Sequence, residues 1–239
     1  GELKFEGEYL NGKKWNGKGY DKLNNVIYEL KNGNGKVIEY DSFGKLRFEG
    51  KYLNGLRNGI IKQYNYNGEL EFEGEYLNDK RNGKGKEYDN FSGILIFEGE
   101  YLNGKRWNGK GIDIYSNNIS YELKNGKGFI KESKYQAQFL NGEKNGFCKE
   151  YSNDTLIFEG EYINGERTGK AKEYDNNGEL EFEGEYLYNY KIKGKNYVNG
   201  ILEYEGEFLC GKKWNGKGFD VNGNKIYELI NGNGKVKEY

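Results

Sequence analysis

The chain has 239 residues, of which 35% are hydrophobic and 31% are charged, and its formal net charge is −1. This hydrophobic share lies below the roughly 45–50% apolar content of typical soluble domains, so a single thick aliphatic core is excluded. The balanced charge excludes a basic surface for nucleic acid. The absence of histidine excludes the catalytic and metal sites that need an imidazole.

The aromatic and glycine content favours an ordered chain that turns often. The sequence holds 23 Tyr, 13 Phe and 38 Gly residues and no Pro. Because proline would remove ladder hydrogen-bond donors, glycine without proline suits a continuous series of antiparallel hairpins. We therefore expect an all-β fold with almost no helix.

Taken in chain order, strand-like segments recur along the whole sequence. Regular units begin at Phe48, Phe72, Phe97, Phe158 and Phe182, and further units begin at Phe5, Tyr28, Tyr121, Tyr135, Tyr204 and Tyr227. The spacing between units varies mostly in the loops. A fixed repeat of this kind indicates stacked supersecondary units that bury a continuous core. We predict one elongated array over residues 1–239, with about 10–11 hairpin units.

Within one unit the residues alternate as in a β-strand. Phe72, Gly74 and Tyr76 share one face, and Glu73 and Glu75 share the other. An Asn-Gly turn then tolerates positive φ. In an antiparallel return strand, Lys84 and Lys86 are expected opposite the two glutamates, and Gly83 and Gly85 under the aromatic rings.

A second unit type contains an inserted tryptophan, Trp15, Trp107 or Trp214, and each is followed by a compressed unit. These pairs occupy about residues 1–40, 93–133 and 200–239, and ordinary units occupy about 47–92 and 134–199. This looks like duplication of a larger block. Each tryptophan either caps a locally different twist or faces a ligand.

The segment that begins at Phe97, FEGEYLNGKRWNGKG, resembles the MORN repeat (membrane occupation and recognition nexus), and so do the corresponding segments of the other units. The chain is also similar to the related YwqK-type hairpin-repeat family. At the first unit, the matching positions are Phe5, Gly7, Glu8, Tyr9, Asn11, Gly12, Lys13, Gly17 and Gly19, with Trp15 as one extra residue. The resemblance covers nearly the whole chain.

Some units depart from the family pattern. The compressed units have Glu-Leu where the family has Gly-Glu, and Gln136-Ala137-Gln138 replaces Glu-Gly-Glu. The resemblance implies a curled antiparallel sheet or solenoid with an aromatic-lined groove. It also implies a protein-protein scaffold, often cytoskeletal or membrane-associated and sometimes dimeric.

The chemistry-bearing residues favour binding over catalysis. Paired carboxylates recur in every unit opposite lysines, as a solvated ladder does, so we expect no enzyme, no cofactor and no metal site. The predicted partner-binding residues are Tyr9, Tyr52, Tyr76, Tyr101, Tyr162, Tyr186, Phe208, Trp15, Trp107 and Trp214. Tyr and Trp are favoured interface residues. The alternative is that these rings are simply the core.

Two other functions stay open from the sequence. The first is association with a phospholipid surface through the lysine-bearing face, at Lys13, Lys105, Lys170 and Lys212. The second is architectural self-assembly, as a homodimer or end to end through open edge strands.

The remaining sequence features concern the setting of the chain. No apolar run approaches the ~20 residues that span a bilayer, and no secretory signal is visible. Cys148 and Cys210 occupy different repeat positions, so we expect free thiols and a cytoplasmic location. The chain begins at Gly1 without methionine and ends at Tyr239 inside a repeat, so we expect a piece of a longer protein.

Overall fold

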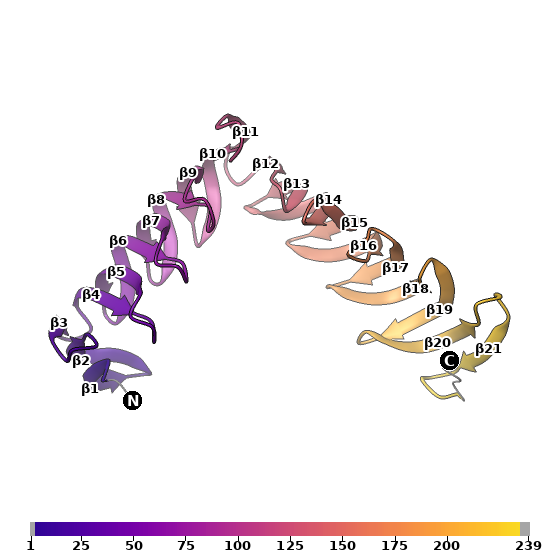
Figure 1. Ribbon diagram of the computed structural model, residues 1–239, viewed down its shortest axis with the longest axis horizontal. Helices are drawn as coiled ribbons and strands as arrows, with labels where there is room; N and C mark the ends of the chain where they lie inside the picture. The colour runs from indigo at the N-terminus through magenta and orange to yellow at the C-terminus, as the bar shows by residue number, and fades with distance from the viewer. Residues whose placement is uncertain (1–2, 235–239) are drawn as a thin grey trace. The chain divides into compact units, whose positions relative to one another are not determined.

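The computed structural model describes residues 3–234, and the chain divides into two compact units, Gly1–Gly126 and Lys127–Tyr239. The two units are treated separately below. Among the described residues there is no helix, and every strand is antiparallel to its neighbours (Figure 1). The prediction of an all-β hairpin array with almost no helix is confirmed.

The first unit, referred to as unit 1, contains β1 (Phe5–Leu10), β2 (Lys13–Tyr20), β3 (Val26–Leu30), β4 (Gly35–Tyr40), β5 (Leu46–Leu53), β6 (Leu56–Tyr64), β7 (Leu70–Leu77), β8 (Lys80–Tyr88), β9 (Leu95–Leu102), β10 (Lys105–Ile112) and β11 (Ile119–Leu123). In unit 2 lie β12 (Gly128–Lys131), β13 (Tyr135–Leu140), β14 (Glu143–Ser152), β15 (Thr155–Ile163), β16 (Glu166–Tyr174), β17 (Leu180–Leu187), β18 (Tyr190–Val198), β19 (Ile201–Leu209), β20 (Lys212–Phe219) and β21 (Lys225–Leu229).

The strands pair in chain order within three sheets, which run β1 to β3, β4 to β11 and β12 to β21. The first two sheets each end at a strand, β3 or β11, that belongs to a compressed unit. Between β3 and β4 the ladder is replaced by a single bridge, Lys31 to Asn34. The first two compressed units therefore end a sheet rather than extending it.

The hairpin register follows the alternation predicted from the sequence. Gly74 stands opposite Gly85, and Glu73 stands opposite Lys86. A Cβ atom at Gly85 would lie 2.6 Å from Cζ of Phe72, so the ring lies directly over the glycine backbone. A side chain at position 85 would have to displace that ring. The predicted pairing of Glu73 with Lys86 and the aromatic cover over Gly85 are confirmed. The predictions for Lys84 and Gly83 are wrong, because the register of the hairpin shifts after Gly74. Glu75 accepts from the backbone N of Lys84 at 3.1 Å, and Gly83 lies against the Glu75 side chain rather than under a ring.

The Asn-Gly turns are linked to one another along one edge of each sheet. The turn asparagines have positive φ, for example 52° at Asn103 and 51° at Asn231. In several hairpins, a second asparagine further along the chain accepts a hydrogen bond from a turn amide of a later hairpin. Asn215 Oδ1 accepts from Asn231 N at 2.6 Å, and Asn82 Oδ1 accepts from Asn103 N at 3.2 Å. These bonds satisfy turn amides that no strand partner reaches.

Replacing Asn215 with Ala is expected to lower the free energy of unfolding by about 1–2 kcal/mol, because the amide of Asn231 loses its acceptor. The Asn215 side chain also donates to Glu207 at 2.8 Å. Chemical denaturation would measure the change. Asn176→Ala, at an exposed loop position, is the matched control, and its expected change is within about 0.5 kcal/mol. Equal effects of the two variants would contradict the turn ladder.

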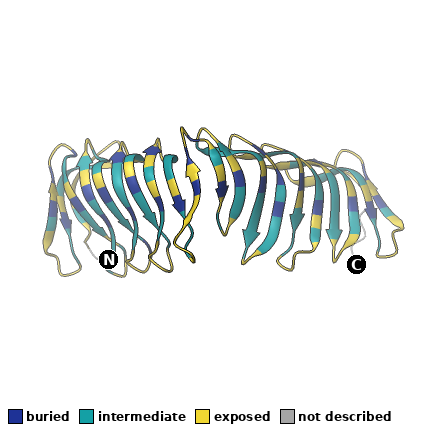
Figure 2. Cartoon of the chain, turned by 90° about the horizontal axis from the view of Figure 1, so that it is seen from above, coloured by how far each residue is buried: buried dark blue, intermediate teal, exposed yellow. Residues whose placement is uncertain are grey.

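The core is a row of aromatic rings on one face of each sheet. Phe72, Phe97, Phe158, Phe182 and Tyr204 are fully buried, whereas the turns along both edges are exposed (Figure 2). Neighbouring units share edge-to-face contacts, such as Phe72 with Tyr101 at 5.3 Å between ring centroids. Edge-to-face packing adds about 0.5–1.5 kcal/mol to the burial of each ring pair. Continuity between units thus comes from rings rather than from aliphatic side chains.

Candidate binding surfaces

Most of the aromatic residues predicted as a binding row lie inside the core. Tyr76, Tyr101, Tyr162, Tyr186 and Phe208 are buried, with exposed fractions of 3–7%. Tyr52 is half-buried, and Tyr9 on the first strand is exposed. A partner cannot reach the five buried rings without displacing the units that cover them. Their role as a binding row stays a prediction, and their burial favours the alternative that they form the core.

The three tryptophans are half-buried and lie next to the turn of the following compressed unit. The backbone carbonyl of Trp15 accepts from Gly33 N at 2.7 Å, and that of Trp214 accepts from Gly232 N at 2.8 Å. The rings of Trp15 and Trp214 also lie over these two glycines, 2.8 Å from the position of a Cβ atom there. These contacts support the structural role of the tryptophans, and a ligand-facing role stays a prediction.

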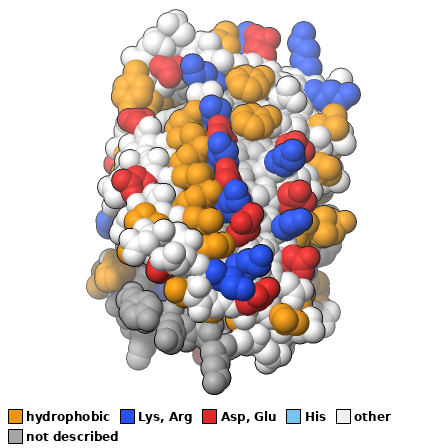
Figure 3. Space-filling model, turned by 90° about the vertical axis from the view of Figure 1, so that its right-hand side faces the viewer, with side chains coloured by type: hydrophobic (Ala, Val, Ile, Leu, Met, Phe, Trp, Pro, Cys, Tyr) orange, Lys and Arg blue, Asp and Glu red, His pale blue; other side chains and the backbone are white. Residues whose placement is uncertain are grey.

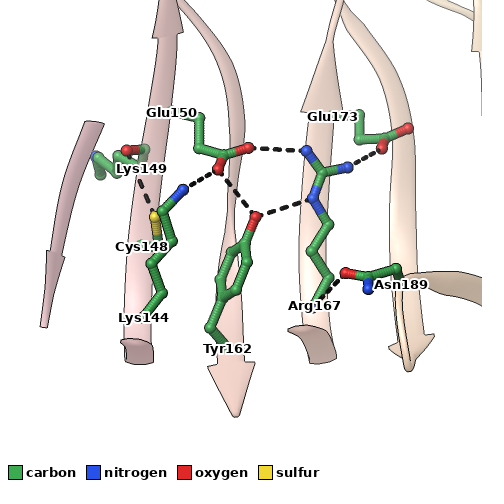
Figure 4. Close-up of polar contacts among 8 residues, drawn as sticks. All are labelled: Lys144, Cys148, Lys149, Glu150, Tyr162, Arg167, Glu173 and Asn189. Atoms are coloured by element: carbon green, nitrogen blue, oxygen red, sulfur yellow. Dashed lines mark hydrogen bonds and ion pairs between the residues drawn. The ribbon is translucent and has the colours of Figure 1, made fainter. Parts of the chain in front are cut away.

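A network of ion pairs covers the aromatic row, and sequence reasoning missed it. In unit 2, Glu150 accepts from Lys144, from Arg167 Nη2 at 2.8 Å and from the Tyr162 hydroxyl at 3.0 Å (Figure 4). Arg167 continues to Glu173 at 2.9 Å, and Glu173 also pairs with Lys191 at 2.7 Å. The carboxylates therefore bridge cations from consecutive units.

The same cations lie over the aromatic rings. The guanidinium of Arg167 is 3.8 Å from the ring centroid of Phe158, and that of Arg81 is 4.0 Å from Phe72. Cation–π contacts of this kind contribute about 0.5–2 kcal/mol. The sequence signal is the Glu-Tyr pair that ends the return strand, together with a basic residue shortly after the turn, and both recur between ordinary units.

Burial and pairing shift the pKa values of these groups in opposite directions. Burial alone would raise the pKa of Glu150, but hydrogen bonds from Lys144 and Arg167 outweigh it and hold that pKa below its ordinary value. The pKa of Glu173 is lowered in the same way: burial would raise it, but the hydrogen bond and charge of Lys191 and the charge of Arg167 together help to outweigh burial. Burial raises the pKa of Cys148, a free thiol in the core, to about 11. The network therefore keeps its carboxylates ionised.

The opposite face carries charge stripes that change sign from strand to strand. In unit 2 these stripes, named here the ladder face, are Glu159 and Glu161 on β15, Lys170 and Lys172 on β16, Glu183 and Glu185 on β17, Lys193 and Lys195 on β18, and Glu205 and Glu207 on β19. Opposite charges stand directly across from one another, as in Lys149 with Glu159 at 3.4 Å. On the face in Figure 3, basic and acidic side chains alternate in columns beside a column of hydrophobic side chains.

The ladder face of unit 2 has a hollow along its middle, between the two charged residues that each strand contributes. The hollow has a volume of about 520 Å³ and runs from β14 to β19 over Ala171, Gly184, Gly194 and Gly206. Phe147 stands at one end of it with 53% of its surface exposed. Unit 1 has a hollow of about 500 Å³ on its ladder face, with the exposed Ile60 in its lining. Both hollows thus combine charged walls with one exposed apolar side chain.

The groove expected from the family resemblance was lined by aromatic rings. A smaller hollow of about 210 Å³ in unit 1 includes Tyr20, Tyr28 and Tyr40 in its lining. The two hollows of about 500 Å³ lie on the Glu/Lys side, and Phe147 is the one aromatic residue that lines either of them among the described residues. The physical reason is that a single sheet must bury its largest apolar side chains before it can offer any of them to a partner.

The lysines considered for lipid binding do not gather into one basic patch. Lys13, Lys170 and Lys212 are exposed, and Lys105 is half-buried. Lys170 stands directly opposite Glu185, so its field is cancelled at short range. Within residues 3–234 no helix could span a membrane. The same residues contain no group of three or more acidic or cysteine side chains placed to hold a metal ion.

Comparison with known proteins gives one family. The family model of the MORN repeat matches residues 72–90, 135–155 and 158–179. No curated protein matches the chain. MORN repeats are a non-catalytic repeat type that generally takes part in protein or membrane interactions.

Two solved structures show a distant similarity. A crystal structure of TcdB2-TccC3 without the hypervariable C-terminal region is 10% identical over 91% of this chain, with a TM-score of 0.23. A TcdB2-TccC3-Cdc42 crystal structure is 8% identical over 91% of this chain, also with a TM-score of 0.23. The chain spans about 14% of the length of either protein. The family match and the hairpin architecture agree on one conclusion: the chain contains MORN repeats, at residues 72–90, 135–155 and 158–179.

Proposed function

We propose that the chain is a non-catalytic scaffold that binds a protein segment in the hollow of unit 2. The observation that carries this proposal is the position of that hollow. It opens on the ladder face beside the half-exposed Phe147, whereas the aromatic row is closed off in the core. Exposed aromatic side chains beside a concave surface are favoured anchors for a partner.

The charge stripes specify which segment fits. Strands lie about 4.8 Å apart, so the sign of the ladder face changes at nearly the pitch of an α-helix, about 5.4 Å per turn. A helix lying along the hollow meets one stripe per turn. We propose a partner helix whose charged residues alternate in sign from turn to turn, with an apolar side chain against Phe147.

An extended strand fits this surface less well. Alternate side chains of a strand repeat every ~6.8 Å, which drifts out of phase with the stripes within two strands. Exposed ion pairs contribute only about 0.2–1 kcal/mol each, so they select register and orientation. The apolar contact at Phe147 then supplies most of the affinity.

The test places a photo-crosslinking amino acid at position 147 of the full chain. In extract of the source cell, we expect a protein adduct from position 147 and none from position 187. Leu187 is the control because it is exposed at a turn edge outside the hollow. The same adduct from both positions, or none from position 147, would overturn the proposal.

A charge variant tests the stripes separately. One charged column of the ladder face runs across β15 to β19 through Glu159, Lys172, Glu183, Lys195 and Glu205. The double variant Lys172→Glu, Lys195→Glu makes every residue of this column negative. We expect the adduct from position 147 to fall at least tenfold in this variant. Circular dichroism would verify that it folds. Unchanged adduct in the folded variant would contradict the helix register.

A further inference from the structure

Unit 1 exposes one large apolar side chain at the tip of every loop on one edge. These loops follow β2, β4, β6, β8 and β10, and their tip residues, named here the tip row, are Leu23, Phe43, Tyr66, Phe91 and Tyr115. Each is 82–89% exposed. Large apolar groups this exposed in a regular series mark an interaction surface.

The loops form a continuous row. Lys22 lies against Gly44 of the next loop, and Asn65 Nδ2 donates to the carbonyl of Asn90 at 2.8 Å. Arg47 stacks on the Tyr66 ring at 4.3 Å. Because each hairpin adds two strands of about 4.8 Å, neighbouring tips are roughly 10 Å apart. The tip row is therefore a regular series of apolar side chains with the spacing of the repeat itself.

The loop backbone is held in place before any partner binds. Asp41 Oδ1 accepts from Phe43 N at 2.8 Å and from Lys45 N at 2.9 Å. Asp89 Oδ1 accepts from Phe91 N at 3.1 Å in the same manner. A fixed loop loses little conformational entropy on binding, so more of the contact energy appears as affinity.

The fold does not need these apolar tips. In unit 2, the Asp175 loop has the same hydrogen bonds to its backbone, at 2.8 Å from Asn177 N and 2.8 Å from Glu179 N. Its tip nevertheless carries the exposed polar residues Asn176 and Asn177. The apolar tips of unit 1 thus serve something other than loop formation.

We propose that the tip row of unit 1 binds the tip row of a second copy of this chain, antiparallel and about a two-fold axis. Side chains spaced at the repeat distance pack best between side chains with the same spacing, and a second copy of this chain presents such a row. An aromatic side chain buries about 150–250 Å² in a core, and a tip in contact on part of its surface buries less, roughly 100–150 Å², so the ten side chains of the two rows bury about 1,000–1,500 Å². That total reaches the lower end of specific protein interfaces, about 1,200 Å².

Charge complementarity fixes the antiparallel direction. The loops at the β2 and β4 end each hold one aspartate and one lysine, Asp21 with Lys22 and Asp41 with Lys45, so their charge is balanced. The loops at the other end carry Asp89 and Asp113 without a lysine. A parallel arrangement would bring these acidic loops of the two copies together, which costs affinity, whereas an antiparallel arrangement places each acidic end against loops that carry lysines. This self-association uses a surface separate from the proposed partner hollow in unit 2.

The first test is the mass of the full chain in solution. By sedimentation equilibrium at micromolar concentrations, we expect the wild type to show twice the mass of one chain. The triple variant Phe43→Asn, Phe91→Asn, Tyr115→Asn is expected to be a monomer, with its dissociation constant raised at least 100-fold. Val221→Asn, at a unit 2 tip with 75% exposure, is the matched control and is expected to dimerise normally. A monomeric wild type, or a dimeric triple variant, would overturn the proposal.

A second test determines the antiparallel arrangement by disulfide cross-linking of introduced cysteines. It uses the Cys210→Ser variant as background, because Cys210 is an exposed thiol that could cross-link by itself. The third of five antiparallel loops meets its own copy, so Tyr66→Cys is expected to give a disulfide-linked dimer on mild oxidation. Leu23→Cys alone is expected to give none, and Leu23→Cys with Tyr115→Cys is expected to cross-link. Efficient linking by Leu23→Cys alone would overturn the antiparallel arrangement. Flotation of a monomeric wild type with phosphatidylcholine–phosphatidylserine vesicles, lost in the triple variant, would instead assign the tip row to a lipid surface.

Discussion

Replacing Phe182 with Ala is expected to lower the free energy of unfolding by about 3–5 kcal/mol. The ring is fully buried, and it makes edge-to-face contacts with Tyr186 at 5.5 Å and Phe208 at 5.8 Å. It also lies over Gly184 and Gly194, so its loss opens a cavity above two glycines that cannot fill it. Urea titration followed by circular dichroism would measure the change, with amide exchange of β17 and β18 as the local readout.

The control for this prediction is Phe129→Ala. Phe129 is the same residue type on β12 of the same unit, but 54% of its surface is exposed. Its substitution is expected to cost less than about 1 kcal/mol. If both variants lost similar stability, the aromatic row would not be the core.

Glu150→Gln is expected to lower the free energy of unfolding at pH 7 by about 2–3 kcal/mol, because charge-assisted bonds from Lys144 and Arg167 are weakened. The pKa of Glu150 and that of Glu173 both lie below the ordinary value in the folded chain. Their contribution is therefore present above the unfolded-state pKa and is lost as pH falls through the folded-state pKa. Wild-type stability should drop as pH falls below about 4.3, the ordinary glutamate pKa.

The acid dependence distinguishes the network from simple packing. Glu150→Gln should flatten the acid limb of the stability curve, which denaturant titrations at several pH values would show. Glu161→Gln, on the exposed ladder face, should change stability by less than about 0.5 kcal/mol and leave the limb as in the wild type. An acid limb unchanged by Glu150→Gln would mean that other carboxylates govern it.

The two faces of each hairpin could be predicted from the sequence because strand alternation has a period of two. Phe72, Gly74 and Tyr76 alternate with Glu73 and Glu75, and the pairing of Glu73 with Lys86 follows from any antiparallel turn at Asn78-Asp79. The ion-pair network was missed because it joins residues from different hairpins. Glu150 and Arg167 are 17 residues apart, and only the stacking of units brings them together.

The tryptophan units also differ from a simple insertion. The sequence alignment treats Trp15 as one extra residue in an ordinary hairpin. In the structure, Gly17 stands opposite Gly7, and Gly19 takes the place opposite Phe5 that a glutamate holds opposite Phe72. The ring of Tyr28 covers Gly19, so a tyrosine replaces part of the ion-pair network there. Register shifts of this size are invisible in composition and spacing, because they depend on which bulge the strand adopts.

The candidate site was predicted less well than the fold. Exposure of an aromatic residue depends on what its neighbours cover, which a repeat pattern does not state. Tyr76 and Tyr66 are both tyrosines of the same array, yet one is in the core and the other lies at a loop tip. The Gln136-Ala137-Gln138 departure is visible in the sequence, whereas the half-exposed Phe147, which lies on the next strand where the register shifts, was not predicted.

The ends of the sheets at the compressed units suggest how a repeat array of this kind can gain or lose units. No strand pairing joins β3 to β4 or β11 to β12, so the segment from β4 to β11 is complete in its own ladder. Copying or deleting that segment as a block leaves no strand without its hydrogen-bonded neighbour. A cut inside the segment would expose a fresh edge strand that is prone to aggregation. We therefore expect arrays of this type to vary in length by whole blocks, with the joins at the compressed units.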